Sequence, residues 1–286
     1  MLENTFCHIH GIGSITENQL WSDGVPSWEA ALAREHLALP PAKTAHLRRS
    51  IQESIAHLDR DDAGFFFQRL PTGQQWRAFP EFRHSVAYLD IETTGLSGLG
   101  DHITTISIYD GRSISCYVHG HNLNAFREDI ARYALIVTYN GKCFDVPFIE
   151  NDLGIALPQA HIDLRYVLAS LGYRGGLKGC ERQLGLDRQD LQDVDGFFAV
   201  LLWDDFCQSG NMRALETLLA YNILDVVNLE ALMVIAYNLK LQGTPFAESH
   251  HLPRPVPPPN PLHADRETIE RIRRDRVDWY ASWLRR

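Results

Sequence analysis

Three short segments place acidic residues where charge is expensive. Asp90 and Glu92 interrupt the apolar run Val86–Leu96, and Asp225 follows Tyr221 in a long apolar stretch. An ionised carboxylate in an apolar environment is costly unless a cation neutralises it. No Lys or Arg lies in Val86–Leu96 or between Tyr221 and Asp225, so divalent cations are the simplest partners. Two such ions held by carboxylates can support the cleavage of phosphodiester bonds.

The spacing of these residues places them on common faces. Asp90 and Glu92 are two apart in a predicted strand, so both side chains point to one side. Tyr221 and Asp225 are four apart in a predicted helix and lie on one helix face. Asp145 follows a predicted strand, where an aspartate often serves only as a helix cap. Asp225 also has an alternative, a salt bridge with a distant arginine, but the three segments together favour a metal site.

The composition indicates a folded protein with one sizeable core and argues against a protein that coats nucleic acid. The chain has 286 residues, 45% of them hydrophobic, which is enough for one sizeable core. Its formal net charge of −9 opposes electrostatic coating of a polyanion. The five cysteines form no C-x-x-C pair, so we expect neither a disulfide framework nor a zinc knuckle, and a cytoplasmic location. The sequence shows no signal peptide, and no apolar run of about 18 residues or more predicts a membrane span.

Sequence patterns divide the chain into four parts. Residues 1–83 predict a small helical segment, in which His10–Gly13 resembles the turn of a helix-hairpin-helix module, although a purely structural glycine turn fits equally well. Residues 84–244 contain the three acidic segments and are predicted to form the catalytic domain. Residues 245–262 contain a Pro-rich tract, expected to be a semi-rigid linker. Residues 263–286 predict a basic amphipathic helix, which could dock on the body or bind a strand or a protein partner.

Within the catalytic domain, a predicted hairpin is followed by alternating strands and helices, which indicates a mixed sheet with helices on both faces. A strand and turn are also predicted from Gly64 to Arg77 in the preceding segment. The other predicted strands are Val86–Ile91, Ile103–Tyr109, Ser113–Val118 and Leu135–Tyr139. The predicted helices are Asn122–Tyr133, Asp145–Leu153, Leu164–Leu171, Lys178–Leu184 and Arg213–Leu241.

The three acidic motifs resemble those of the DEDD exonuclease superfamily, in its tyrosine-bearing DEDDy branch. The run Asp-Ile-Glu-Thr-Thr-Gly from Asp90 is similar to the first motif, Asn140-x-x-x-Phe-Asp145 to the second, and Tyr221-x-x-x-Asp225 to the third. The second motif, with a proline two residues after its aspartate, also resembles proofreading domains of family B DNA polymerases. The stand-alone architecture with a Gly-Ile-Gly segment near its start resembles bacterial YprB-like RNase H-like proteins.

This resemblance implies an RNase H-like α/β fold with a five-stranded mixed sheet in the order 3-2-1-4-5. It also implies a metal-dependent 3′→5′ exonuclease that acts on the 3′ ends of single-stranded DNA or RNA. The implied catalytic residues are Asp90, Glu92, Asp145, Tyr221 and Asp225. Two Mg²⁺ or Mn²⁺ ions would be held by the four acids, and Tyr221 would position the attacking water. Three further positions match those that touch the terminal nucleotide: Thr93, Leu96 and Asn140.

Other interpretations remain open at this stage. A structure-selective endonuclease or a non-catalytic nucleic-acid-binding adaptor could use the same fold. Asp163 is expected to cap a helix, with a metal-binding role as the weaker alternative. Arg174 and Lys178, around two glycines, form either a phosphate-contacting loop or a solvated turn. Phe197, Phe198 and Trp203 are expected to be core residues rather than stacking platforms for bases.

Overall fold

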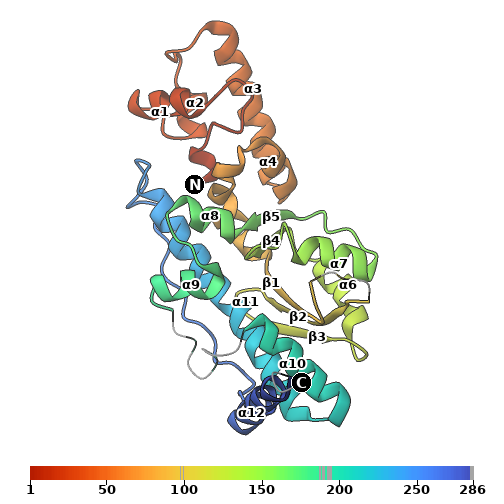
Figure 1. The fold of residues 1–286 in the computed structure, drawn as a ribbon. Coiled ribbons are helices and arrows are strands. Elements are labelled where there is room, and N and C mark those ends of the chain that lie inside the picture. The colour runs from red at the N-terminus through yellow and green to blue at the C-terminus, as the bar shows by residue number, and fades with distance from the viewer. Residues whose placement is uncertain (97, 99, 187, 189–190, 192–194, 284–286) are drawn as a thin grey trace.

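A five-stranded sheet forms the centre of the fold in a computed structural model of the protein (Figure 1). The structure describes residues 1–96, 98, 100–186, 188, 191 and 195–283, without the side chains of 276–283. The strand order is β3-β2-β1-β4-β5, as predicted. β1 pairs antiparallel with β2 and parallel with β4, so the sheet is mixed. The strands are β1 (Val86–Thr93), β2 (Ile103–Tyr109), β3 (Ile114–Val118), β4 (Leu135–Thr138) and β5 (Ala160–Asp163).

Alternation along β1 builds two separate apolar layers. Val86 and Tyr88 pack in one hydrophobic cluster, whereas Ala87, Leu89 and Ile91 pack in the other. The first layer is covered by α8 (Leu164–Ser170) and α11 (Met212–Leu241), and the second by α6 (Phe126–Ile130) and α7 (Asp145–Leu153). Figure 1 shows α6 and α7 on the side of the sheet opposite α11. The predicted arrangement with helices on both faces is confirmed.

The central helix of the protein is α11. It begins after Asn211, whose side chain accepts a hydrogen bond from the backbone N–H of Arg213. It packs against β1 and β2 and presents buried residues on nearly every side. By length and composition α11 could cross a membrane, but 83% of its most apolar window is buried inside the protein. Burial on this scale is what a core helix requires.

The N-terminal segment is helical, as predicted, and lies above the sheet in Figure 1. Ser27 caps its second helix by accepting from the N–H of Ala30. Gly11 adopts a left-handed φ of +79° in the turn that precedes the first helix. The helical elements are η1 (Leu2–Asn4), α1 (Ser14–Ser22), α2 (Trp28–Ala33), α3 (Pro41–Leu58), α4 (Ala63–Arg69), η2 (Thr72–Ala78), α5 (Phe79–Phe82) and η3 (Arg83–Ser85).

The strand predicted from Gly64 is wrong, because this stretch forms the helix α4 and then η2. The run of three phenylalanines favours a strand by propensity alone. Asp62 overrides this preference, since its side chain accepts from the N–H of Phe65 at 3.0 Å and starts a helix. Phe65 and Phe66 are then buried in the core of the segment.

The chain returns along α11 after that helix ends. Asn238 of α11 exchanges two hydrogen bonds with Leu252, and the Asn260 side chain donates to the carbonyl of Ala220 at 2.8 Å. Residues 252–260, which contain the Pro-rich tract, therefore run beside α11 from its end towards its beginning. The remaining elements are η4 (Leu123–Ala125), α9 (Gly176–Gln183), α10 (Gly196–Ser209) and α12 (Arg266–Trp283).

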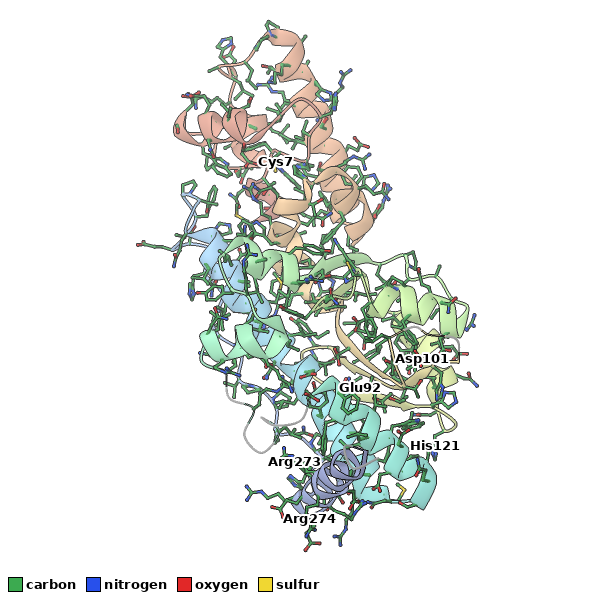
Figure 2. All side chains as sticks on the ribbon, in the orientation of Figure 1. Cys7, Glu92, Asp101, His121, Arg273 and Arg274 are labelled. Carbon is green, nitrogen blue, oxygen red and sulfur yellow. The ribbon has the colours of Figure 1, made fainter. Side chains whose placement is uncertain are left out.

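The last helix, α12, docks on α10 and α11. Ile269 and Ile272 are buried in the cluster that also contains Leu202 of α10, and Arg271 pairs with Asp205 at 2.6 Å. Figure 2 shows Arg273 and Arg274 on this helix. Docking is thus observed for the described part, and nothing here supports a protein partner. The side chains of Trp279, Tyr280 and Trp283 in this helix are outside the described part of the structure.

Candidate active site

Three carboxylates meet on the face of the sheet that α11 covers. Asp90 and Glu92 belong to β1, and Asp225 belongs to α11. One oxygen from each lies within 4.8 Å of the others, which is close enough for a shared cation. These acids line a cavity of about 480 Å³ together with Asp145 and Tyr221. Figure 2 shows Glu92 where β1 meets α10 and α11. The structure therefore brings the five predicted catalytic residues into one cavity.

The periodicities of β1 and α11 explain this gathering. Alternate residues of a strand share a face, so Asp90 and Glu92 both point towards α11 rather than towards α7. The pairing of β1 with β2 shifts between Glu92 and Thr93, which marks a bulge or irregularity beside the acids. One helical turn separates Tyr221 from Asp225, so both enter the same cavity.

Asp145 lies in the cavity but outside the tight group of three. It is the first residue of α7 and is 3% exposed. Burial raises its pKa to about 7, although backbone N–H groups, including that of Ile91, oppose the rise. A cation near Asp145 would favour its charged form, so the residue suits a metal contact. That contact stays a prediction.

Negative charge exceeds positive charge among the described residues that line the cavity. Four carboxylates face two cationic side chains, those of Lys178 and Arg188, so two negative charges remain when all are ionised. Burial raises the pKa of Asp90 and of Glu92 well above the ordinary value, and repulsion from neighbouring carboxylates raises both further. Divalent cations would remove this repulsion and offset the excess charge.

Arg188 is the internal partner of Asp225. Its guanidinium donates to Asp225 and also to Oε2 of Glu181 at 2.6 Å. Asn228 donates to the other oxygen of Glu181 at 2.8 Å, and all four side chains are buried. Burial raises the pKa of Asp225, and Arg188 opposes that rise. The alternative of a salt bridge with a distant arginine is thus observed, yet it coexists with a cavity and two further carboxylates.

Two cationic side chains lie near the ring of Tyr221. The Nζ atom of Lys178 lies 5.0 Å from the centre of its ring, and the guanidinium of Arg188 lies 5.2 Å from it. Burial, followed by the nearby charge of Asp225, raises the pKa of the Tyr221 phenol far above its ordinary range. The phenol therefore stays protonated, which suits it to orient a water molecule by hydrogen bonding and not to remove a proton.

Asn222 is a site residue that the sequence analysis missed. It is fully buried in α11 and donates from Nδ2 to Oδ2 of Asp90 at 2.7 Å. Thr105 of β2 donates to its Oδ1 at 3.2 Å, which fixes the orientation of the amide. The available signal was a polar residue beside Tyr221 in an otherwise apolar helix. Glu181 and Arg188 carried no such signal, because each stands in a locally polar sequence.

The three predicted substrate-contact residues also line the cavity. Thr93 donates from Oγ1 to the carbonyl of Gly95 at 2.6 Å, which shapes the turn after β1. Leu96 is 86% exposed, so it presents an apolar side chain at the edge of the cavity. Asn140 has a φ of +70°, which is uncommon for a residue with a side chain. Contact with a terminal nucleotide stays a prediction for all three.

Asp163 organises the loop between β4 and α7 without entering the cavity. It caps α8 through the N–H of Arg165, as predicted. Its carboxylate also accepts from the backbone N–H of Asn140 at 2.7 Å and of Lys142 at 3.1 Å. The three donors explain its burial, and the alternative role as a fifth metal ligand gains no support.

The fold and the acid arrangement agree with a known class of proteins. The sequence profile of the RNase H superfamily matches residues 87–237, which is more than half of the chain. This chain belongs to the RNase H superfamily, as its motifs and strand order predicted.

Two individual proteins are similar to this chain at low sequence identity. The chain is 29% identical over 177 residues to the uncharacterized protein YprB of Bacillus subtilis (strain 168). That alignment covers 53% of this chain and 42% of YprB, so the chain spans less than half of its relative. The family B DNA polymerase of the hyperthermophilic archaeon Pyrobaculum calidifontis aligns with a TM-score of 0.38 at 14% identity, over 55% of this chain and 29% of the polymerase.

Proposed function

We propose that this protein is a metal-dependent 3′→5′ exonuclease that removes nucleotides from single-stranded DNA or RNA. The observation that carries the proposal is the convergence of Asp90, Glu92 and Asp225 within 4.8 Å, beside a cavity that also contains Asp145 and Tyr221. Membership of the RNase H superfamily, whose nucleases generally use divalent metal ions, supports phosphodiester cleavage as the reaction.

The residues present fit two Mg²⁺ or Mn²⁺ ions. Carboxylate oxygens are the ligands that these hard cations prefer, and no histidine or cysteine lines the cavity among its described residues. Asp90, Glu92 and Asp225 would hold one ion, with Asp90 and Asp145 at the other. Bound ions would supply charge stabilisation for the attacking and leaving oxygens of the phosphodiester.

The protein's own side chains would prepare the reaction in three ways. The protonated Tyr221 would hydrogen-bond the attacking water and aim it at the phosphorus. Asn222 would hold Asp90 in place through the amide described above. Leu96 and Asn140, at the cavity edge, would contact the terminal nucleotide and set its position.

A free 3′ end is the substrate that suits this cavity. A volume of about 480 Å³ lies within the range of about 300–1,000 Å³ typical of small-ligand pockets, so it suits a single nucleotide better than a duplex. The overall negative charge also disfavours binding along a duplex.

The test is digestion of a 5′-labelled oligonucleotide, as DNA and as RNA, with Mg²⁺ or Mn²⁺. A ladder that shortens from the 3′ end, requires the metal and disappears in Asp90→Ala and Asp225→Ala is the expected result. Tyr221→Phe should lower kcat while leaving the metal concentration at half-maximal rate unchanged. Absence of cleavage on every substrate would refute the proposed activity, and an equal loss of rate and metal affinity would refute the role of Tyr221.

A further inference from the structure

A second cavity adjoins the candidate active site. Its volume is about 510 Å³, and it shares Tyr139 and Asn140 with the first cavity. The rest of its lining comes from α8, from the loop that follows it and from Gly176 at the start of α9, and Gly175 and Gly176 both have positive φ. Two cavities that share part of their lining can hold consecutive units of one polymeric ligand.

The second cavity has the opposite charge from the first. Arg165 and Arg174 both line it, and no acidic residue does so among its described lining. Both side chains are exposed, and neither forms an ion pair within the described part of the chain. Arg165 instead donates a hydrogen bond to Oδ1 of Asn140. Arginine side chains presented in this way suit phosphate groups.

Aromatic rings complete the lining. Tyr139 and Tyr173 both line the cavity and are half-buried, so each side chain is partly packed against the protein and partly accessible. The Tyr139 hydroxyl lies 3.7 Å from Sγ of Cys180, and the backbone N–H of Tyr173 donates to the carbonyl of Leu168 at 3.0 Å. A rigid tyrosine beside an arginine can stack a base of any identity next to its phosphate.

Asn140 stands at the junction of the two cavities. Its left-handed backbone, φ +70°, is fixed from one side by Asp163, which accepts its N–H at 2.7 Å. Its side chain is fixed from the other side by Arg165. Such strain persists where surrounding contacts determine it, and here it places one polar side chain between the acid cavity and the arginine cavity.

We propose that the second cavity binds the nucleotide that precedes the 3′-terminal one. Arg165 and Arg174 would contact the backbone phosphates, and Tyr173 would stack on the base. The protein would then recognise a single strand of at least two nucleotides, with one nucleotide in each cavity. This inference rests on the proposed exonuclease function, which defines the first cavity as the site of the 3′-terminal nucleotide.

The experiment compares a one-nucleotide substrate with a longer one. The substrates are thymidine 5′-monophosphate p-nitrophenyl ester and a 5′-labelled thymidine tetranucleotide. Arg174→Ala and Tyr173→Ala should each raise KM for the tetranucleotide by about tenfold and leave KM for the ester unchanged. The matched control is Arg182→Ala, an exposed arginine of α9 that lines neither cavity, and it should behave as the original protein. Equal effects on both substrates, or no effect of either variant, would overturn the inference.

A binding measurement separates this inference from the proposed activity. Fluorescence anisotropy in EDTA would compare labelled mononucleotide and tetranucleotide without cleavage. The tetranucleotide should bind about tenfold more tightly, and Arg174→Ala should abolish that difference while Arg174→Lys restores part of it. If the protein cleaves neither substrate, the proposed activity fails, and the second cavity is then judged by this titration alone. Equal affinity for both labelled compounds would contradict the inference.

Discussion

At the scale of single residues, the site depends on how Asp225 is held. Arg188 shares its guanidinium between Asp225 and Glu181, and Asn228 fixes Glu181 from the other side. A buried guanidinium that pairs with two carboxylates interacts less strongly with each of them than it would with a single carboxylate. Asp225 can therefore remain ordered and still offer an oxygen to a metal ion.

This arrangement predicts the effect of neutralising Glu181. In Glu181→Gln, Arg188 would pair more strongly with Asp225 and compete with the metal. We expect Mn²⁺ affinity to fall by about 10-fold, in line with outer-shell changes at other metal sites. Isothermal titration of Mn²⁺ measures this directly. Glu216→Gln, an exposed change on α11, is the control and should leave affinity unaltered. Unchanged affinity in the Glu181 variant would show that the shared guanidinium does not influence the metal site.

Asn222 provides a second test at this scale. Replacement by leucine removes the hydrogen bond to Asp90 and leaves Thr105 without its partner, at a cost of about 1–3 kcal/mol in stability. Because Asp90 would lose its fixed orientation, kcat should fall by about 10- to 100-fold in protein that is still folded. Rate measurements would be paired with a urea unfolding curve. A rate that falls only with the folded fraction would reduce Asn222 to a structural role.

At the scale of elements, α11 connects the site to the rest of the protein. It carries Tyr221, Asn222 and Asp225, and both the returning Pro-rich segment and α12 lie against it. The hydrogen bond from Asn260 reaches the carbonyl of Ala220, next to Tyr221. The C-terminal part of the chain therefore supports the helix that supplies half of the site.

Docking of α12 can be measured through Ile272, which is 7% exposed. Ile272→Ala should lower the free energy of unfolding by about 2–3 kcal/mol, because it leaves a cavity between α12 and the helices beneath it. Arg274→Ala, at an exposed position of the same helix, should change stability by less than about 0.5 kcal/mol. Urea titration of both variants gives the comparison. Two equally small effects would mean that α12 does not stabilise the body.

The N-terminal segment should be sensitive to acid through His8. This side chain is buried against Trp28 and Phe66, its Nε2 lies 2.8 Å from Ser54, and burial lowers its pKa to about 3. Between pH 6.5 and about 3, His8 is protonated in the unfolded chain but stays neutral in the folded protein. Stability is therefore lost as pH falls from 6.5 towards 3.

Thermal or urea unfolding at pH 7 and pH 4 tests this dependence. His8 should account for about 3 kcal/mol of the stability lost between the two pH values. The variant His8→Leu should lack that part of the loss, whereas Ser22→Ala, an exposed-face change in α1, should keep it. An identical pH dependence in the histidine variant would contradict the assignment.

Sequence patterns predicted the positions of four of the five strands of the central sheet, where runs rich in apolar and β-branched residues are bounded by turn signals. Asp90, Glu92 and Asp225 were predictable because each places a charge in an apolar run, and Tyr221 was predictable from its spacing of four residues from Asp225. The helix α10 was not predicted: Asp195 caps it by accepting from the N–H of Phe198, which a single sequence does not distinguish from a loop aspartate. Phe198 and Trp203 of that helix are buried, as expected for core residues. The same expectation was wrong for Phe197, which is 54% exposed and lines the candidate active-site cavity.

Long-range partners account for what the sequence did not predict. Arg188 and Asp225 are 37 residues apart, and Thr105 and Asn222 are 117 apart, so no local pattern connects them. The fifth strand, Ala160–Asp163, is only four residues long and gives too short an alternation to stand out. The Pro-rich tract was predicted as a spacer, but its contacts with α11 depend on Asn238 and Asn260 in three dimensions.

At the scale of the whole molecule, two cavities of opposite charge lie side by side on a protein with a net charge of −9. Two arginines, Arg165 and Arg174, therefore lie in a cavity that adjoins the acids. This arrangement suits an enzyme that binds the end of one strand better than an enzyme that acts within a duplex.

The most direct measurement compares a linear and a circular single strand of the same sequence with Mg²⁺ or Mn²⁺. The account predicts that the linear strand is shortened stepwise from its 3′ end, that the circle stays intact, and that Asp90→Ala abolishes the ladder. Cleavage of the circle, or survival of both strands with metal bound, would contradict it.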